Sequence, residues 1–162
     1  MRFILDLDDT LAQTTRDMRG DESRVEELTP APGAKEFLEF LKARGDFHAL
    51  VTVGREEVQR AKIAKLGFAF DDIAIVPKTG DPSMKRRAIE KLAKEGDTRV
   101  PCVLVGDRLD RDISVGNALG LMTVRMALPE GRYSSIEPQS ELERPTYTAR
   151  DFFELMSLPL FA

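Results

Sequence analysis

Segments typical of β-strands alternate with segments typical of α-helices along this chain of 162 residues, and this alternation limits the possible folds most. The strand-like segments are short apolar runs, expected over 2–7, 47–53, 71–77, 100–107 and 121–126, with a short edge strand at 146–148. Strands that alternate with helices pair in parallel, and the helices cover both faces of the sheet. The sequence therefore predicts an α/β fold, a doubly wound three-layer sandwich with a mostly parallel central sheet.

The helix-like segments place apolar residues on one face. They are expected within 29–45, 55–67, 83–96, 111–120 and 149–158. The clearest is 83–96, where apolar residues recur with a period of about 3.6 and Gly96 ends the pattern. Two stretches, 12–31 and 127–145, have no clear place in this scheme.

The length and composition are those of one globular domain, 1–162, with a full hydrophobic core. The formal net charge is -4, and this mild acidic excess argues against a broad nucleic-acid-binding surface. The chain has one cysteine, Cys102, and one histidine, His48. These counts exclude a Cys/His zinc cluster and disfavour a Ser-His-Asp triad.

Nothing in the sequence is typical of a secretory signal or a membrane span. The apolar stretch near the first residue is broken by Asp6, whereas a signal core needs roughly 7–15 apolar residues and a span about 18. A lone cysteine forms no internal disulfide, which favours a reducing compartment. We therefore expect a cytoplasmic protein without a membrane partner.

Polar side chains capable of chemistry lie where the expected strands end. Asp6 and Asp8 follow the first strand, Thr52 closes the second, Lys78 follows the third and Asp107 follows the fourth. In an open parallel sheet, ligands bind beyond the carboxyl ends of the strands, where these side chains would meet. The sequence therefore predicts one site at that edge of the sheet.

The acids of this site suit a divalent cation. Asp6 and Asp8 are two positions apart, so at a strand end their carboxylates leave the same face and must share a proton or a cation. With Asp107 they form a set of oxygen ligands for Mg²⁺, which also accepts phosphate oxygens and water. The alternative is a strand that ends in a turn, with Asp8 or Asp9 capping a helix.

Three motifs in this sequence resemble those of the haloacid dehalogenase (HAD) superfamily of phosphohydrolases. LDLDDTL at 5–11 resembles the first motif, Asp-x-Asp-x-Thr, and ALVTVG at 49–54 resembles a strand that ends in Thr or Ser. VGDRLDRD at 105–112 resembles the motif Gly-Asp-x-x-x-x-Asp. The resemblance implies a Rossmann-like core and phosphatase activity on a small phosphorylated substrate or a phosphorylated macromolecule.

The resemblance also implies catalytic roles. Asp6 would attack phosphorus and carry an aspartyl-phosphate, and Asp8 would act as general acid and then as general base. Thr52 and the backbone N–H groups of Val53 and Gly54 would hold phosphoryl oxygens. An acid two positions after the nucleophile favours cleavage of phosphate esters over dehalogenation.

The metal ligands follow from the same resemblance. Mg²⁺ would be held by Asp6, by the backbone carbonyl of Asp8 and by Asp107, and Asp112 would support these ligands from one helical turn away. A lysine would neutralise charge between Asp6 and the phosphate.

Two lysines are candidates for that role, Lys78 directly after the third strand and Lys85 at the start of the next helix. Lys85 would point toward the site only if its helix begins near Asp81 or Ser83. The sequence favours Lys78 and leaves Lys85 as a substrate-binding alternative.

The spacing of the motifs leaves no room for a separate cap domain between them, so the site is expected to be open. Family members without a cap either act on large substrates or take a cover from a partner subunit, which makes a homo-oligomer possible. The segments 12–30 and 127–147 are candidate partial lids, and Arg132 and Tyr133 in the second could contact substrate. An ordinary surface loop is the alternative for each segment.

Other functions stay open at this point. A phospho-receiver signalling domain is also doubly wound, but it carries its phosphorylated Asp on a middle strand, and here the third strand ends without an acid. A non-catalytic scaffold of this fold would have lost Asp6 or Asp8, and both are present. A mutase is disfavoured because no lid would hold a sugar phosphate through two transfers.

Overall fold

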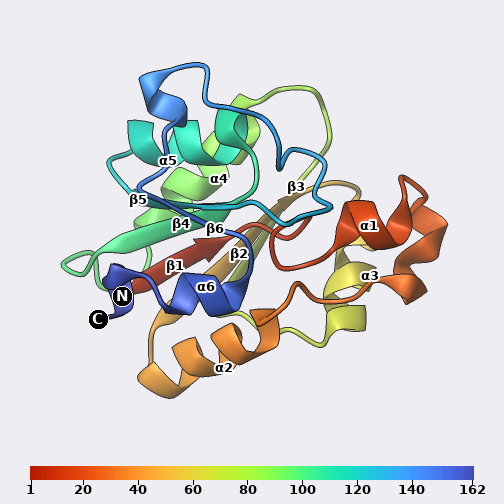
Figure 1. Ribbon diagram of the computed structural model, residues 1–162, viewed down its shortest axis with the longest axis horizontal. Coiled ribbons are helices and arrows are strands. Elements are labelled where there is room, and N and C mark those ends of the chain that lie inside the picture. Colours follow the sequence, from red (N-terminus) through yellow and green to blue (C-terminus); the bar gives the residue numbers. More distant parts are fainter.

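Six strands form a single sheet in the computed structural model, which describes all residues from Met1 to Ala162 (Figure 1). Every pair of neighbouring strands runs parallel, in the order β3-β2-β1-β4-β5-β6. The strands are β1 (Arg2–Leu5), β2 (Phe47–Val53), β3 (Asp72–Val76), β4 (Cys102–Gly106), β5 (Met122–Met126) and β6 (Tyr147–Ala149). The predicted parallel sheet is therefore confirmed.

Helices cover both faces of this sheet, which confirms the three-layer sandwich. In Figure 1, α2 (Ala34–Arg44) and α6 (Phe152–Met156) lie on one face, and α4 (Ser83–Ala93) and α5 (Ser114–Ala118) lie on the other. The remaining helices are α1 (Thr14–Met18) and α3 (Glu56–Leu66). No inserted domain interrupts this core, as predicted from the spacing of the motifs.

The central strand β1 shows how the sequence builds two hydrophobic cores. Successive side chains of a strand point to opposite faces of the sheet. Phe3 and Leu5 accordingly belong to the same buried cluster as Phe37 of α2, whereas Ile4 belongs to a second cluster with Ile89 of α4. All of β1 is buried, as expected for a strand covered on both faces.

The strand order places a topological switch point beside β1. The chain proceeds from β1 outward to β2 and β3, and then returns to add β4, β5 and β6 on the other side of β1. In sheets of this order, the crevice between the two central strands is where ligands bind. Asp6 follows β1 and Asp107 follows β4, so both flank this crevice.

The segments without a clear prediction contain little regular structure. The first holds α1 and a 3₁₀ helix at Glu22–Glu27, and the second holds only a 3₁₀ turn at Glu141–Glu143. The helix expected over 111–120 begins earlier, as the π-helical turn η2 (Leu109–Ile113), and continues as α5. None of the helices has the length and apolar character that a membrane span requires.

Candidate active site

A cavity of about 590 Å³ opens at the carboxyl ends of the central strands. Its wall includes nine of the residues selected from the sequence: Asp6, Asp8, Val53, Gly54, Lys78, Lys85, Asp107, Arg132 and Tyr133. Thr52 and Asp112 are fully buried behind this wall. The parallel sheet therefore gathers the selected residues in one place.

Asp6 is the most central carboxylate of the cavity and is only 5% exposed. The Nζ of Lys85 lies 2.9 Å from its Oδ1, and the hydroxyl of Thr10 lies 3.5 Å from its Oδ2. The backbone N–H of Asp6 donates to the carbonyl of Val105 in β4 at 2.9 Å, so the sheet fixes the backbone at this position. The lysine offsets part of the cost of burying the carboxylate.

Asp112 shares Lys85 with Asp6. Its Oδ1 lies 2.5 Å from Lys85 Nζ, and its Oδ2 accepts the backbone N–H of Arg108 at 3.0 Å. The π-helical turn η2 carries Asp112 back over the end of β4, where only a glycine fits. A Cβ at Gly106 would lie 2.5 Å from Asp112 Oδ2, so the absence of a side chain there lets the carboxylate reach the lysine.

Burial dominates the electrostatics of this group. It raises the pKa of Asp6 from 3.8 to about 7, because Lys85 opposes the shift only in part and Asp112 adds to it. It also raises the pKa of Asp107 well above the usual range, with further contributions from Asp6 and Asp112. Burial alone would lower the pKa of Lys85, but the carboxylates of Asp112 and Asp6 outweigh it and raise that pKa. The lysine therefore stays charged beside Asp6 and Asp107, which resist ionisation.

The acids form a cluster that fits a divalent cation. Carboxylate oxygens of Asp6, Asp107 and Asp112 lie within 4.8 Å of one another. One lysine faces these three acids, so the cluster can accept further positive charge. Oxygen-only ligands are those that a hard cation such as Mg²⁺ prefers. Two of the predicted metal ligands, Asp6 and Asp107, belong to this cluster. Asp112, which was expected only to support them, has a carboxylate oxygen equally close to theirs.

The side chain of Asp8 points to different partners. Its Oδ1 accepts from Lys62 Nζ and from the Thr14 hydroxyl, both at 2.7 Å, and its Oδ2 accepts from Gln59 Nε2 at 2.9 Å. Gln59 Nε2 also lies 2.5 Å from the hydroxyl oxygen of Thr52. The side chain of Asp8 is 33% exposed, so it faces the cavity with its charge compensated from α3.

The family of the chain follows from a direct match. The model of a family described as haloacid dehalogenase-like hydrolase matches residues 3–120. This chain belongs to the haloacid dehalogenase-like hydrolases. Membership in this family favours the hydrolase interpretation over a phospho-receiver domain.

Two curated relatives of this HAD-like chain are named as phosphatases. The glyceraldehyde 3-phosphate phosphatase of Methanopyrus kandleri is 31% identical over 123 residues, which cover 74% of this chain and 52% of the relative. The ribulose-1,5-bisphosphate 5-phosphatase of Halopiger xanaduensis is 34% identical over 104 residues, which cover 62% and 43%. The chain thus spans about half the length of the curated relatives it matches.

A solved structure confirms the HAD-like fold independently. The HAD hydrolase YfnB from Bacillus subtilis, bound to magnesium, superposes with a TM-score of 0.70 and 16% sequence identity, over 96% of both chains. At this identity the likeness concerns the fold alone.

The lysine next to Asp6 in this HAD-like site is Lys85, whereas the sequence favoured Lys78. Lys78 is exposed on the wall of the cavity and forms no ion pair. Helix α4 begins at Ser83, which is the condition set for Lys85 to point inward. The physical reason is the position of α4. Ile89, one turn after Lys85, belongs to the same buried cluster as Ile4 of β1, whereas Lys78 follows β3 at the edge of the sheet.

The predicted phosphate-binding groups after β2 are arranged differently from the expectation. The backbone N–H of Gly54 donates to the carbonyl of Val76 at 3.0 Å, so it is engaged in the sheet. The hydroxyl oxygen of Thr52 accepts from Gln59, which leaves the hydroxyl proton for another acceptor. Thr52 therefore keeps one free hydrogen-bond donor. Gly54 has no side chain, and this lets the backbone lie close to the side chain of Gln59.

Two buried polar residues of α3, Gln59 and Lys62, were not predicted from the sequence as part of the site. Gln59 is 1% exposed and Lys62 is 6% exposed. The sequence carried a partial signal for both, since Gln59 lies four positions before Ile63 and Lys62 four before Leu66, on one face of the helix. A polar residue on an apolar stripe indicates a partner, which here is Asp8.

The role of Asp9 in holding the loops around the site was also not predicted. It adopts a left-handed backbone conformation with φ of 52° and is 5% exposed. Its carboxylate accepts the backbone N–H of Thr15 at 2.8 Å, the hydroxyl of Thr15 at 2.6 Å and the backbone N–H of Arg132 at 3.0 Å. One buried carboxylate therefore fastens both candidate lid segments, 12–30 and 127–147, to the edge of the cavity.

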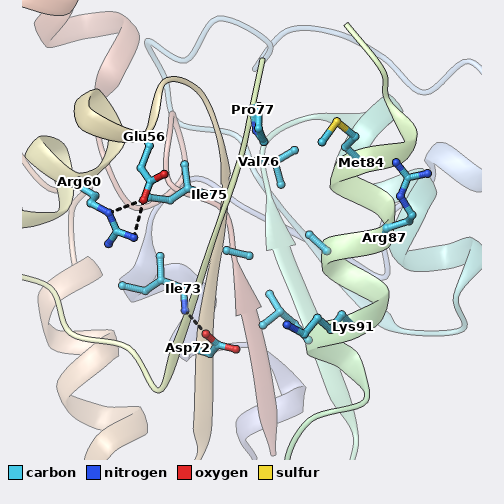
Figure 2. Close-up of a pocket in the computed structure, with 13 residues that line it drawn as sticks. Glu56, Arg60, Asp72, Ile73, Ile75, Val76, Pro77, Met84, Arg87 and Lys91 are labelled. Atoms are coloured by element: carbon cyan, nitrogen blue, oxygen red, sulfur yellow. Dashed lines mark hydrogen bonds and ion pairs between the residues drawn. The ribbon is translucent and has the colours of Figure 1, made fainter. Parts of the chain in front are cut away.

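A second cavity, of about 460 Å³, lies along the edge strand β3 between α3 and α4 (Figure 2). Its acids are already engaged, since Glu56 pairs with Arg60 at 2.9 Å and Asp72 accepts the backbone N–H of Ile73 at 2.7 Å. It brings together no carboxylate cluster of the kind around Asp6. The first cavity is therefore the candidate active site.

Proposed function

We propose that this chain is the core of a Mg²⁺-dependent phosphatase that hydrolyses phosphate monoesters through an aspartyl-phosphate on Asp6. The observation that supports this most directly is the buried cluster of Asp6, Asp107 and Asp112 around Lys85, with Asp8 at the side. Phosphoryl transfer needs positioning and stabilisation of charge more than covalent chemistry, and this cluster supplies both.

The first step would use the two acids of the first motif. An oxygen of Asp6 forms a bond to phosphorus, and the bond from phosphorus to the leaving oxygen breaks. The leaving oxygen takes a proton from Asp8. In the second step water attacks phosphorus, Asp8 takes its proton, and the carboxylate of Asp6 is released together with inorganic phosphate.

The surrounding groups would hold the charge that develops. Mg²⁺, when bound by Asp6, Asp107 and the carbonyl of Asp8, supplies neutralising positive charge to the phosphoryl oxygens. Asp112 lies close enough to contribute and also positions Lys85. Lys85 rather than Lys78 neutralises charge between Asp6 and the phosphate. Thr52 donates its hydroxyl proton to a phosphoryl oxygen once the side chain of Gln59, which lies between it and the cavity, has moved aside.

The substrate we propose is a small phosphorylated molecule. The curated relatives are named for phosphorylated sugars and trioses, and a cavity of about 590 Å³ holds a ligand of that size.

The test is the release of phosphate from p-nitrophenyl phosphate with Mg²⁺. We expect Asp6→Asn and excess EDTA each to abolish it, while Glu39→Gln, at an exposed acid on α2, leaves it intact. Activity that survives either treatment would overturn the mechanism. Lys85→Ala should lower kcat by orders of magnitude more than Lys78→Ala, and equal effects would contradict the assignment of Lys85.

A further inference from the structure

Four basic side chains line the cavity without a part in the proposed chemistry. They are Lys78, Arg108, Arg111 and Arg132. Arg108 pairs with Asp110 at 2.6 Å, and Arg111 lies 3.9 Å from the same carboxylate. Arg132 and Lys78 have no acidic partner. The positive charges of Arg132 and Lys78 are therefore not neutralised by a direct ion pair.

Two of these guanidinium groups share one aromatic ring. The Cζ atom of Arg108 lies 4.5 Å from the ring centre of Tyr133, and that of Arg132 lies 5.4 Å from it. Arg108 Nη1 also lies 3.4 Å from the Tyr133 hydroxyl. Contact with the same ring holds both guanidinium groups at one part of the cavity wall.

The loop that carries Arg132 and Tyr133 is held in place by a buried arginine of β5 and by Asp9. Arg125 of β5 is 7% exposed, and its Nη2 donates to three carbonyls of this loop at 2.7 to 3.0 Å. Those carbonyls belong to Tyr133, Ser134 and Ile136. The carboxylate of Asp9 also accepts the backbone N–H of Arg132, at 3.0 Å. A loop fixed at both points presents its cations without a large ordering cost.

Two further acids line the cavity. They are Asp21, and Glu22, which pairs with Arg55 at 2.7 Å. Because Glu22 already has a cationic partner and Arg132 has no acidic partner, an anionic substituent of a substrate is attracted to Arg132.

We propose that Arg132 and Arg108 bind a second anionic group of the substrate, a carboxylate or another phosphate, while its first phosphate lies at Asp6. Guanidinium groups suit this task because their planar N–H donors match the oxygens of carboxylates and phosphates. The inference rests on the proposed phosphatase function and narrows its substrates to small molecules that carry two anionic groups.

The test compares three matched substrates: propyl phosphate, 3-(phosphonooxy)propanoate and propane-1,3-diyl bisphosphate. We expect the wild-type enzyme to show a kcat/KM at least about tenfold higher for one or both of the two-anion substrates than for propyl phosphate. The two arms distinguish a carboxylate from a phosphate as the preferred second group.

Substitutions then assign the effect to the proposed residues. Arg132→Gln and Arg108→Gln should each lower the ratio of two-anion to one-anion kcat/KM by about tenfold. The control is Arg144→Gln, at an exposed arginine of the same segment that pairs with Glu141 outside the cavity, and it should keep the wild-type ratio.

The outcomes separate the two proposals. Equal kcat/KM for all three substrates, or an equal fall of the ratio in Arg144→Gln, would overturn the second-anion site and leave the phosphatase proposal standing. No phosphate release from any of the three, or from p-nitrophenyl phosphate, would overturn the phosphatase proposal and the second-anion site with it.

Discussion

The substitution Asp6→Asn tests the electrostatics of the buried cluster through stability, without any substrate. Burial raises the pKa of Asp6 from 3.8 to about 7, with Lys85 opposing the shift. The folded chain therefore keeps a proton on Asp6 that the unfolded chain releases above about pH 4. The stability of the metal-free protein should fall as the pH rises from about 4 to 7, and then level off.

The size of the effect follows from the same shift. A pKa change of about three units corresponds to about 4 kcal/mol at 1.36 kcal/mol per unit. The shift already includes the attraction between Asp6 and Lys85, so asparagine at pH 8 removes the net cost. We expect a gain of up to about 4 kcal/mol, or up to roughly 16 °C in Tm for a chain of this length.

The assay is thermal unfolding followed by circular dichroism in EDTA at pH 5 and pH 8. At pH 5 the carboxyl of Asp6 is protonated in the folded state and ionised in the unfolded state, so only about 1.6 kcal/mol of the cost is present. Asp6→Asn should therefore unfold only slightly above the wild-type temperature. At pH 8 the variant should unfold at a higher temperature than the wild type, and Glu39→Gln should match the wild type at both values. A difference in Tm that is the same at pH 5 and pH 8 would refute the reasoning.

Three further predictions test the cluster and its supports. Adding Mg²⁺ should raise the Tm of the wild type more at pH 8 than at pH 5, because the ionised cluster binds the cation, and Asp6→Asn should reduce this rise. Lys62→Met should lower kcat by about tenfold to a hundredfold with little change in KM, because Asp8 loses its cationic partner. Lys62→Arg should restore most of the lost kcat. An unchanged kcat in Lys62→Met would contradict a role of Lys62 in positioning Asp8. Gly106→Ala should cost about 1–3 kcal/mol in chemical denaturation, because its Cβ would meet Asp112 at 2.5 Å, and wild-type stability would show that the carboxylate can move aside.

The strands and their carboxyl ends could be predicted because they depend on local pattern. The apolar run at 47–53 is β2 at the same bounds, and the acids after the first and fourth strands do lie together. Both results need only the period of the side chains and the rule that parallel strands end at one edge. Asp6 and Asp107 therefore follow from the sequence without any long-range information.

Other features could not be predicted because they depend on how helices lie over the sheet. The choice between Lys78 and Lys85 depends on the position of α4 over β1, which no local pattern contains. The turn η2 departs from the regular helix that its sequence suggested, and that departure brings Asp112 to Lys85. The segments after Asp9 and before β6 were unplaced because a single carboxylate organises them across a separation of 123 positions.

Asp6 and Asp8 follow the same strand, yet the structure gives them different surroundings. Asp6 is buried among acids with Lys85 from α4, whereas the side chain of Asp8 is one-third exposed with Lys62 from α3. A nucleophile needs fixed geometry and nearby positive charge, and an acid/base group needs contact with the leaving oxygen and with water. Two carboxylates in environments this different can take separate roles in one reaction, which is the pattern known from other acid pairs. The two lysines come from helices on opposite faces of the sheet, α3 and α4. They therefore support the division of roles proposed for the two acids.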